Sequence, residues 1–456
     1  MRAMKAKNCS ALAFVGFLGA LALLSSPKAD AQNVSPEMRR ELDAAFQGIL
    51  ADPTNLDKTY DYAKMATAAG DYEAAITSYE RLLLFNPDLP RVKTELGILY
   101  YRLGSFDTAR SYLTDALKSP GVPVEVQDRI QEFLSKIDET KSKNRFSGSL
   151  AFGGRYQSNA NYGPEGQVLV LNAPANPNDD TEADDDFNAF FALTGRYVYD
   201  IGNDAGDFFG IEGSVYGARQ LELTTLDVEH FRVIAGPGLR YYPSPDTPVL
   251  VRPHMRATYV RLDDESYNFS LGGGLDIDWK AFDKTTLFLN SLAEDREYYV
   301  TKERQNSNTQ DGAAYEVALG AIHEIDQNMA VRGRVFAGIV DARSDFEAYR
   351  ELGASMTFNM RFDSPFEGDE DFALVAAPWN FSLNGRYSNR EHDGPNLLVA
   401  NDTRQDDDIR VNSTVAVPLA DGWSVFTTLG YQWNLSNIPN NDFENFSATL
   451  GANLRF

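Results

Sequence analysis

The sequence predicts two parts, a short helical solenoid followed by a C-terminal antiparallel transmembrane β-barrel of about fourteen strands. Two observations carry this prediction. Apolar residues recur at helical spacing up to about residue 142, and beyond it they alternate with polar residues, as in strands, as far as Phe456. After the first 24 residues there is no run of about 20 apolar residues, so we expect no later helix to span a membrane.

The first 31 residues have the pattern of a secretory signal peptide. Basic residues precede an apolar run, 11–24, and Ala29-Asp30-Ala31 provides a small-x-small cleavage site. The run is too short for a comfortable transmembrane span, which needs about 20 residues. The single cysteine of the chain, Cys9, lies in this segment, so we expect the mature protein to lack disulfides and thiolate metal sites.

Residues 32–142 are expected to form a periplasmic helical domain, because part of this region repeats. "AAGDYEAAITSYERLLLFNP" and "RLGSFDTARSYLTDALKSPG" match at an offset of 34 residues, with small residues where two helices approach and aromatic residues between them. The period and the pattern resemble the tetratricopeptide repeat. The residues predicted to carry the packing are Gly70, Ala75, Tyr79, Gly97, Gly104 and Ala109.

Two flanking stretches, 34–50 and 123–139, have the spacing of amphipathic helices and are expected to cap the repeats. Such a module is either a bare helical spacer or a groove that holds a peptide or protein partner, and we favour the groove. The charged stretch "KIDETKSKNR", residues 136–145, is predicted to link the module to the second part.

Residues 143–456 are predicted to form the barrel. Its alternating segments are 146–157, 186–199, 207–220, 228–241, 249–262, 266–279, 284–296, 311–324, 329–343, 347–361, 378–390, 406–418, 422–435 and 443–456. Connections after even-numbered segments are mostly tight, whereas several after odd-numbered segments are long or acidic, above all 158–185. Short turns at one end and long loops at the other are typical of an outer-membrane barrel.

The two faces of these segments support a closed barrel, since lipid offers no partners to an open sheet edge. In the segment 329–343, Val331, Val335 and Ile339 share one face, and Arg332 and Arg334 share the other. Aromatic residues near the short-turn ends form the expected interfacial girdle. These are Tyr241, Tyr242, Trp279, Trp379 and Trp423.

These patterns place the protein in the outer membrane of a Gram-negative cell as a monomeric barrel in contact with lipid. The last alternating segment ends at Phe456 and resembles the signal by which barrel-insertion machinery selects its clients, so we expect that machinery to be a partner. The formal net charge of −24 argues against a nucleic-acid partner, because phosphate contacts need a basic surface.

The inward face of the predicted barrel is rich in arginine. The arginines on this face are Arg155, Arg196, Arg232, Arg240, Arg252, Arg256, Arg332, Arg334 and Arg386. The inward carboxylates include Glu212, Asp276, Asp278 and Glu316. The arginines either line a conduit for an extended, partly anionic cargo or form a ladder of salt bridges that stiffens the wall. We favour the ladder.

We expect neither catalysis nor a bound metal or cofactor. The acidic clusters in the presumed outer loops match no calcium-loop spacing, and no nucleotide-binding pattern occurs. Outer-membrane phospholipases resemble one another in an H-x-S motif, in which the histidine is the base and the serine is the nucleophile. None of the four histidines here is followed by a serine two residues later. His392 beside Asp393 leaves a hydrolytic arrangement open.

The stretch "GSLAFGGRYQSNANYGP", 148–164, carries a family resemblance. A glycine-rich strand followed by Ser158, Asn159, Asn161 and Pro164 in the matching positions is similar to the surface lipoprotein assembly modifier family. The resemblance implies a periplasmic tetratricopeptide module joined to a fourteen-stranded outer-membrane barrel. It also implies translocation of lipoproteins or soluble proteins to the cell surface, with the module capturing the cargo or a chaperone.

Two alternatives stay open. Exopolysaccharide exporters also join tetratricopeptide repeats to a barrel, and inward arginines could conduct an anionic glycan. A simple porin with a helical tether is the other alternative. We favour a protein cargo because a short repeat module suits peptide binding.

Overall fold

The computed structural model describes residues 36–52, 54–119, 122–164, 166–176, 182–244, 247–366, 378–419 and 422–456. The predicted signal peptide, including Cys9, lies outside these residues. The chain divides into two compact units, Met1–Lys141 and Ser142–Phe456.

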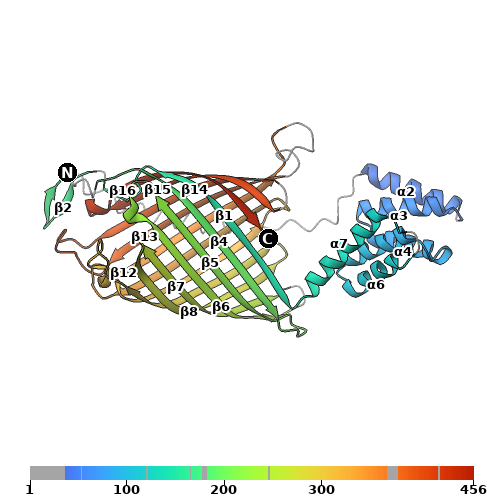
Figure 1. Cartoon of the computed structure of the whole chain (residues 1–456), viewed down its shortest axis with the longest axis horizontal. Helices are drawn as coiled ribbons and strands as arrows, with labels where there is room; N and C mark the ends of the chain where they lie inside the picture. The colour runs from blue at the N-terminus through green and yellow to red at the C-terminus, as the bar shows by residue number, and fades with distance from the viewer. Residues whose placement is uncertain are drawn as a thin grey trace. The chain divides into compact units, whose positions relative to one another are not determined.

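The first unit is helical, and Figure 1 draws its helices in blue to teal. They are α2 (Pro36–Ala51), α3 (Leu56–Ala69), α4 (Tyr72–Phe85), α5 (Pro90–Arg102), α6 (Phe106–Leu117) and α7 (Val124–Lys141). Among the described residues, each helix is too short or too polar to cross a membrane.

Local sequence explains where these helices start and stop. Asn55 precedes α3, and its side chain accepts a hydrogen bond from the backbone N–H of Lys58 at 3.1 Å. Gly70 ends α3 with a φ of 80°, in the left-handed region that favours glycine. Gly104 has a φ of 74° at the equivalent place between α5 and α6. The glycines of the two repeats therefore share one backbone role.

The residues predicted to carry the repeat packing lie between the helices. Ala75 and Ala109 are fully buried, and the ring of Tyr79 is 1% exposed. A Cβ on Gly97 of α5 would lie 2.5 Å from Cγ of Leu113 on α6. A glycine at this position therefore lets the two helices approach as closely as they do.

The prediction of a linker at 136–145 is wrong. The helix α7 continues to Lys141 and the first barrel strand starts at Asn144, so only two residues lie between them. Ile130 and Ile137 of α7 are fully buried in the second apolar cluster of the unit. This buried face continues the helix through residues whose charge alone suggested a linker.

The second unit is built from long tilted strands (Figure 1). They are β1 (Asn144–Gln157), β4 (Asp186–Asp200), β5 (Phe208–Gln220), β6 (Val228–Tyr241), β7 (Val249–Leu262), β8 (Glu265–Phe282), β9 (Thr285–Tyr298), β10 (Gly312–Glu324), β11 (Met329–Ala342), β12 (Tyr349–Phe362), β13 (Trp379–His392), β14 (Gln405–Pro418), β15 (Trp423–Ser436) and β16 (Phe443–Arg455). Each strand lies within three residues of its predicted bounds.

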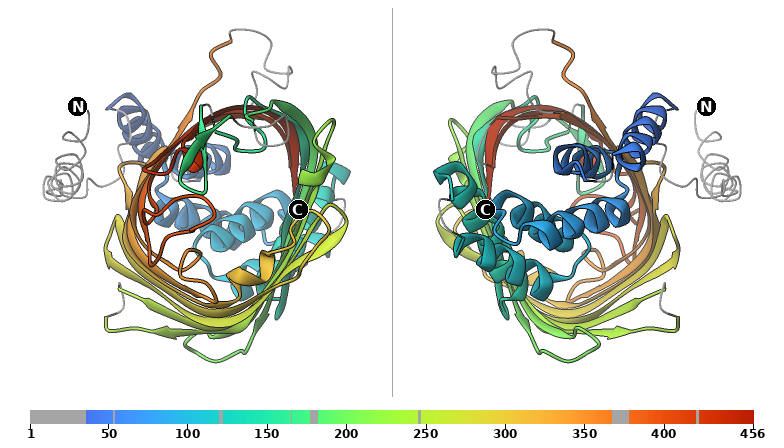
Figure 2. Two further views of the ribbon diagram at one scale, coloured as in Figure 1. Left: turned by 90° about the vertical axis from the view of Figure 1, so that its left-hand side faces the viewer. Right: turned by 90° about the vertical axis from the view of Figure 1, so that its right-hand side faces the viewer.

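These strands form a closed antiparallel barrel, seen end-on as a ring in Figure 2. Each pairs with the next, and β1 pairs with β16 to close the ring. The predicted fold class, a helical solenoid followed by a barrel of fourteen strands, is confirmed. We call the barrel end where β1 starts the terminal end, and the opposite end, which carries the connection 158–185, the loop end.

The outer face of the barrel is apolar. Large apolar side chains are exposed on it, among them Phe152, Leu193, Leu319, Leu352 and Leu450. Exposed aromatic residues lie near strand ends at the terminal end, including Tyr241, Trp279 and Trp423. A closed barrel with an apolar outer band and aromatic residues at its margin is the architecture of an outer-membrane barrel.

The sequence analysis missed a hairpin in the connection 158–185. Its strands are β2 (Val168–Val170) and β3 (Ala173–Ala175). Leu171 and Asn172, between the strands, have φ values of 51° and 62°. Two successive positive φ values are those of a type I′ turn, which favours Asn and Gly far more than leucine.

Candidate functional site

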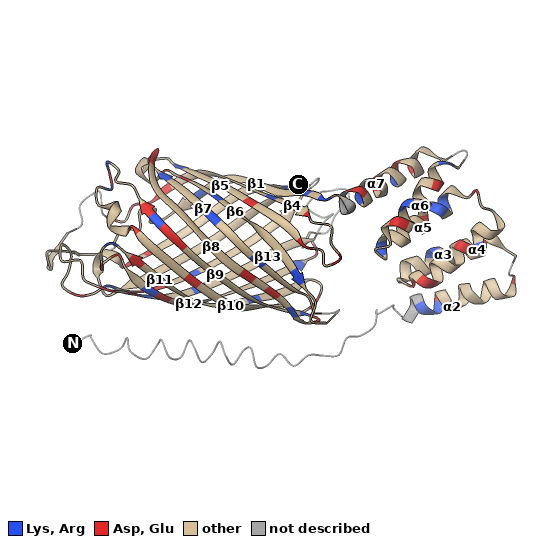
Figure 3. Ribbon diagram, turned by 90° about the horizontal axis from the view of Figure 1, so that it is seen from below, with Lys and Arg blue, Asp and Glu red and all other residues tan. Residues whose placement is uncertain are grey.

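The register of the barrel strands places all nine predicted arginines on the inner face. The residues next to them in sequence point to the outer face, because side chains alternate along a strand. Figure 3 shows basic and acidic positions side by side on neighbouring strands. The candidate site is therefore the lumen together with the loops that fold over its loop end.

Arg252 has the largest number of acidic partners on the lumen wall. Its guanidinium lies 3.4 Å from Asp276, 3.5 Å from Asp278 and 3.9 Å from Glu212. Glu212 also pairs with Arg196 at 3.3 Å. This network connects β4, β5, β7 and β8 through side chains that all belong to the predicted inward sets.

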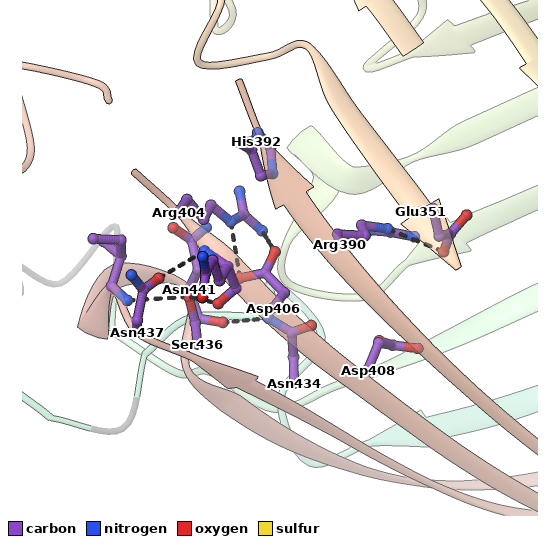
Figure 4. Close-up of polar contacts among 12 residues, drawn as sticks. Glu351, Arg390, His392, Arg404, Asp406, Asp408, Asn434, Ser436, Asn437 and Asn441 are labelled. Carbon is purple, nitrogen blue, oxygen red and sulfur yellow. Dashed lines mark hydrogen bonds and ion pairs between the residues drawn. The ribbon is translucent and has the colours of Figure 1, made fainter. Parts of the chain in front are cut away.

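Two further carboxylates each hold a pair of arginines. Glu294, whose side chain is 3% exposed, lies 3.6 Å from Arg256 and 2.9 Å from Arg296. Glu351 lies 3.2 Å from both Arg386 and Arg390 (Figure 4 draws the contact with Arg390). The sequence analysis missed both carboxylates, although each holds an inward position in the alternation.

Several arginines also lie over aromatic rings in the lumen. Arg332 lies 4.3 Å from the ring centre of Phe288, a typical cation–π distance. Arg334 and Arg386 lie 4.8 Å and 4.7 Å from the ring centre of Phe336. Arg334 also pairs with Glu316 at 3.6 Å. These contacts hold the guanidinium groups against the wall.

Four of the nine predicted arginines differ from the others, because among the described residues they form no ion pair with a carboxylate: Arg155, Arg232, Arg240 and Arg332. Arg155 donates to the Tyr216 hydroxyl and, at 3.5 Å, to the side chain of Asn188. Arg232 lies 3.3 Å from Nε2 of His230. Five of the eight arginines on the candidate path, Arg196, Arg252, Arg256, Arg334 and Arg386, are in ion pairs, which favours the salt-bridge interpretation for those five.

The β2–β3 hairpin is attached to two other connections at the loop end. The backbone N–H of Leu169 donates to Oδ1 of Asn440 at 2.8 Å, and Nδ2 of Asn440 donates to the carbonyl of Leu169 at 3.1 Å. At the tip, the backbone N–H of Leu171 donates to the carbonyl of Leu398 at 2.9 Å. In the left view of Figure 2, the green hairpin and the orange and red loops lie within the outline of the ring.

A buried polar cluster supports these loops, as Figure 4 shows. Asp406 is 1% exposed and accepts a hydrogen bond from Nε of Arg404 at 3.0 Å. The backbone N–H of Gln405 donates to Oδ1 of Asn437 at 2.7 Å, and Nδ2 of Asn434 donates to the carbonyl of Asn441 at 2.5 Å. These bonds link the start of β14 to the connection after β15.

His392 contacts the backbone. Its Nδ1 lies 2.7 Å from the carbonyl oxygen of Phe346, and its ring packs 5.3 Å from that of Tyr349. These contacts join the end of β13 to the connection before β12 and give the histidine a structural role at the loop end.

A cavity lies near each end of the barrel. One, of about 950 Å³, lies at the terminal end and includes Arg361, Asn380 and Ser382 in its lining. The other, of about 260 Å³, lies between the loops and is lined in part by Glu347 and Arg404. Burial raises the pKa of Glu347, and the nearby Arg404 opposes this rise.

The motif residues at 158–164 lie at the junction of β1 and β16. The backbone N–H of Ser158 donates to the carbonyl of Phe446, and the N–H of Phe446 donates to Oγ of Ser158, both at 2.9 Å. Asn159, 2% exposed, donates from Nδ2 to the carbonyl of Glu444 at 3.1 Å. Ser158 and Asn159 of the motif therefore form hydrogen bonds to the last strand, β16.

The other half of the motif holds its own loop. Nδ2 of Asn161 donates to the carbonyl of Glu182 at 2.7 Å, and its Oδ1 accepts from the N–H of Asp184 at 3.1 Å. Pro164 is buried beside it. The sequence analysis identified these positions by resemblance. It missed Asn445 of β16, whose Oδ1 accepts a hydrogen bond from the backbone N–H of Asn159 at 3.2 Å.

A tetratricopeptide repeat family model matches residues 63–104. No curated protein matches the chain. Among solved structures, the chain is similar to the type III secretion chaperone SycD of Yersinia enterocolitica in complex with a peptide of the translocator YopD. That similarity has 17% identity, 29% coverage of this chain, 91% coverage of the other and a TM-score of 0.22.

Two further solved structures are also similar. A bacterial polysaccharide outer membrane secretin has 8% identity, with 68% of this chain and 98% of the other covered and a TM-score of 0.34. A FadL homologue of Pseudomonas aeruginosa has 10% identity, with 69% and 90% covered and a TM-score of 0.35. Similarity at this level does not identify a function.

Proposed function

We propose that the chain is an outer-membrane translocator that delivers lipoproteins or soluble proteins to the cell surface, as its resemblance to the surface lipoprotein assembly modifier family implies. The helical unit captures the cargo, or a chaperone that carries it, in the periplasm. The barrel then passes the cargo through the membrane without a catalytic step, and barrel-insertion machinery recognises the last barrel strand, β16, together with Phe456.

The observation that carries this proposal is the union of a tetratricopeptide-type module and a closed barrel on one chain. Two residues, Ser142 and Lys143, connect α7 to β1. A partner captured by the module is thus held on the same molecule as the barrel. A barrel that only conducts small solutes has no use for a peptide-binding module, which disfavours the simple porin.

The lumen charges bear on the choice between a protein and a glycan. A conduit for an anionic glycan is expected to offer cations that are free to meet it. Arg252 is surrounded by three carboxylates, and Arg256 and Arg386 share theirs with a second arginine. Because these arginines are paired with carboxylates, this part of the wall does not bind anionic cargo in preference to cationic cargo. This favours a protein cargo, which carries both signs of charge.

The proposal is tested by comparing the surface and secreted proteins of a deletion strain with those of its parent, with a surface-glycan assay on the same cells. We expect one or a few proteins to disappear from the surface or the medium and to accumulate in the periplasm. Complementation with the intact chain should restore them, and a chain that lacks residues 36–141 should not. An unchanged set of proteins together with loss of a surface sugar would contradict the proposal.

A further inference from the structure

The ladder between β1 and β16, which we call the seam, has fewer paired residues in total than any other ladder of the barrel among the described residues. It extends from Ser149↔Arg455 to Gln157↔Ser447, and at the terminal end Gly148 and Phe456 exchange two further backbone hydrogen bonds, of 2.7 and 3.1 Å. The other ladder of β1, with β4, covers the full length of the strand. The remaining ladders also pair more residues than the seam does.

Side chains add little to the seam. Elsewhere in the barrel, lumen ion pairs such as Arg334–Glu316 connect neighbouring strands. Among the described residues, the side chains of 149–157 make neither a hydrogen bond nor an ion pair with those of 447–455. Gly153 and Gly451 lie opposite each other there, so this pair adds no side-chain contact. Within its paired length, the seam therefore depends mainly on its backbone hydrogen bonds.

The seam is reinforced at the loop end by Ser158 and Asn159. Besides the paired bonds of Ser158 with Phe446, the backbone N–H of Asn159 donates to Oδ1 of Asn445 at 3.2 Å. Asn445 is 5% exposed. A buried amide that loses its partners is costly, so these bonds hold the strands together where the ladder ends.

The same asparagine is also tied to the loop that carries the β2–β3 hairpin. Nδ2 of Asn159 donates to the carbonyl of Gly163, and its Oδ1 accepts from the N–H of Gly163, both at 2.8 Å. A Cβ on Gly163 would lie 2.7 Å from backbone atoms of Glu182 and Ala183, so this turn is tightly packed. Movement of the hairpin loop therefore acts directly on Asn159.

We propose that Ser158 and Asn159 form a clasp that holds the seam shut, and that the barrel wall opens at the seam when this clasp is released. Displacement of the hairpin loop pulls Asn159 from Glu444 and Asn445, and the ladder then separates from the loop end. The use of this opening in transport rests on the proposed function, whereas the opening itself is a property of the isolated barrel.

Hydrogen exchange on the purified full-length protein in detergent tests the opening without any cargo. We expect the seam amides of β1 and β16 to exchange sooner than those between β14 and β15. Asn159→Ala removes the bond from Nδ2 to the carbonyl of Glu444 and both side-chain bonds to Gly163. It should speed exchange at the seam about tenfold, the effect of the one buried hydrogen bond that crosses the seam. The matched control is Asn384→Ala, which removes a 2.7 Å bond to Thr357 between β12 and β13 and should act only there.

Ser158→Ala is a milder variant that serves if Asn159→Ala fails to fold, because it removes only the bond from the N–H of Phe446. It should speed exchange in the same strands by a smaller factor. Seam amides that are as protected as those of β14 and β15, and that do not respond to either variant, would overturn the proposal.

A disulfide lock tests the use of the seam in transport. Ala151→Cys with Asn453→Cys places two thiols opposite each other across the seam. Thr414→Cys with Thr428→Cys does so between β14 and β15, where the two native hydroxyls are 2.8 Å apart. The only native cysteine, Cys9, lies in the predicted signal peptide, so it should not interfere.

We expect oxidation of the seam pair to stop surface delivery, a reductant to restore it, and the control pair to have no effect. Normal delivery through an oxidised seam would overturn the role in transport while leaving the proposed function in place. If deletion of the whole chain leaves surface proteins unchanged, the proposed function fails, and hydrogen exchange still decides whether the seam opens.

Discussion

The ring of Phe288 on β9 occupies the space that a side chain on Gly320 of β10 would need. A Cβ on Gly320 would lie 2.3 Å from Cζ of this ring and 2.3 Å from the carbonyl oxygen of Gly333. Phe288 is 4% exposed, and the guanidinium of Arg332 lies 4.3 Å from the centre of its ring. The glycine, the ring and the guanidinium therefore form one stack on the lumen wall.

This stack predicts a strong effect of a single methyl group. Gly320→Ala should destabilise the barrel by roughly 1–3 kcal/mol, because the ring and the neighbouring backbone must move. Gly213→Ala is the matched control, since a Cβ there meets nothing within 4 Å. The measurement is the temperature at which the folded, fast-migrating form converts to the unfolded form on a gel. Equal conversion temperatures for the two variants would contradict the prediction.

A parallel prediction concerns the helical unit. Gly97→Val places a branched side chain against Leu113, which is fully buried, and should destabilise this unit by roughly 1–3 kcal/mol. Gly48→Val in α2 should change the stability little, because a Cβ at Gly48 meets nothing within 4 Å. Thermal unfolding of the full chain, followed by its helical circular dichroism, separates the two outcomes. Equal unfolding temperatures for Gly97→Val and Gly48→Val would contradict the prediction that the close approach of α5 and α6 requires a glycine at position 97.

Glu351 is predicted to keep the lumen electrically balanced near the loop end. Glu351→Gln leaves Arg386 and Arg390 without their shared carboxylate, and should destabilise the barrel by roughly 1–3 kcal/mol. In a planar bilayer, the reversal potential should shift toward anion selectivity. Glu297→Gln is the control, since Glu297 alternates with Glu294 and lies on the other face of β9. A shift of equal size in the control would show that the lumen position is irrelevant.

The phenol of Tyr100 gives a prediction about pH. Burial, and then its hydrogen bond to Glu80 at 2.9 Å, raise the pKa of Tyr100 to about 12, from an ordinary value of 10.0. A raised pKa in the folded state means that the neutral phenol is favoured there. The resulting stabilisation is fully present below pH 10 and is lost as the pH rises through 12.

This pH dependence is checked by phenolate absorbance. The difference between the titration curves of the native chain and Tyr100→Phe should have its midpoint near pH 12. Glu80→Gln removes the acidic partner but not the burial, and should move that midpoint down, to between 10 and 12. A midpoint near 10 in the native chain would contradict the contact between Tyr100 and Glu80.

The barrel strands were predictable because each obeys a local rule. A strand with lipid on one side and a polar lumen on the other must alternate, and β11 shows this in the row of Val331, Val335 and Ile339 opposite Arg332 and Arg334. The positions that pack between the helices were also predictable from the sequence, since the second repeat has similar residues 34 positions after the first. The linker prediction failed at 136–145 because a solvated helix face and a linker have the same charged composition.

The β2–β3 hairpin was not predictable by the same rule. Its strands have three residues each, too few to show a period, and its backbone partners at Leu398 and Asn440 lie in distant connections. The first central position of its turn also holds Leu171, where a type I′ turn favours Asn or Gly. Such a hairpin is stabilised by the loops around it and has little local signal of its own.

The sequence by itself determined the order of the two units, the number of barrel strands and the face on which each arginine lies, because these depend on spacing along one chain. Tertiary structure alone decided what each polar group meets. Glu294 and Glu351 became partners of arginines through the register between strands, and Asn159 reached Glu444 across 285 positions of sequence. Hydrogen bonds and ion pairs act over a few ångströms, so their partners appear only once the barrel has closed.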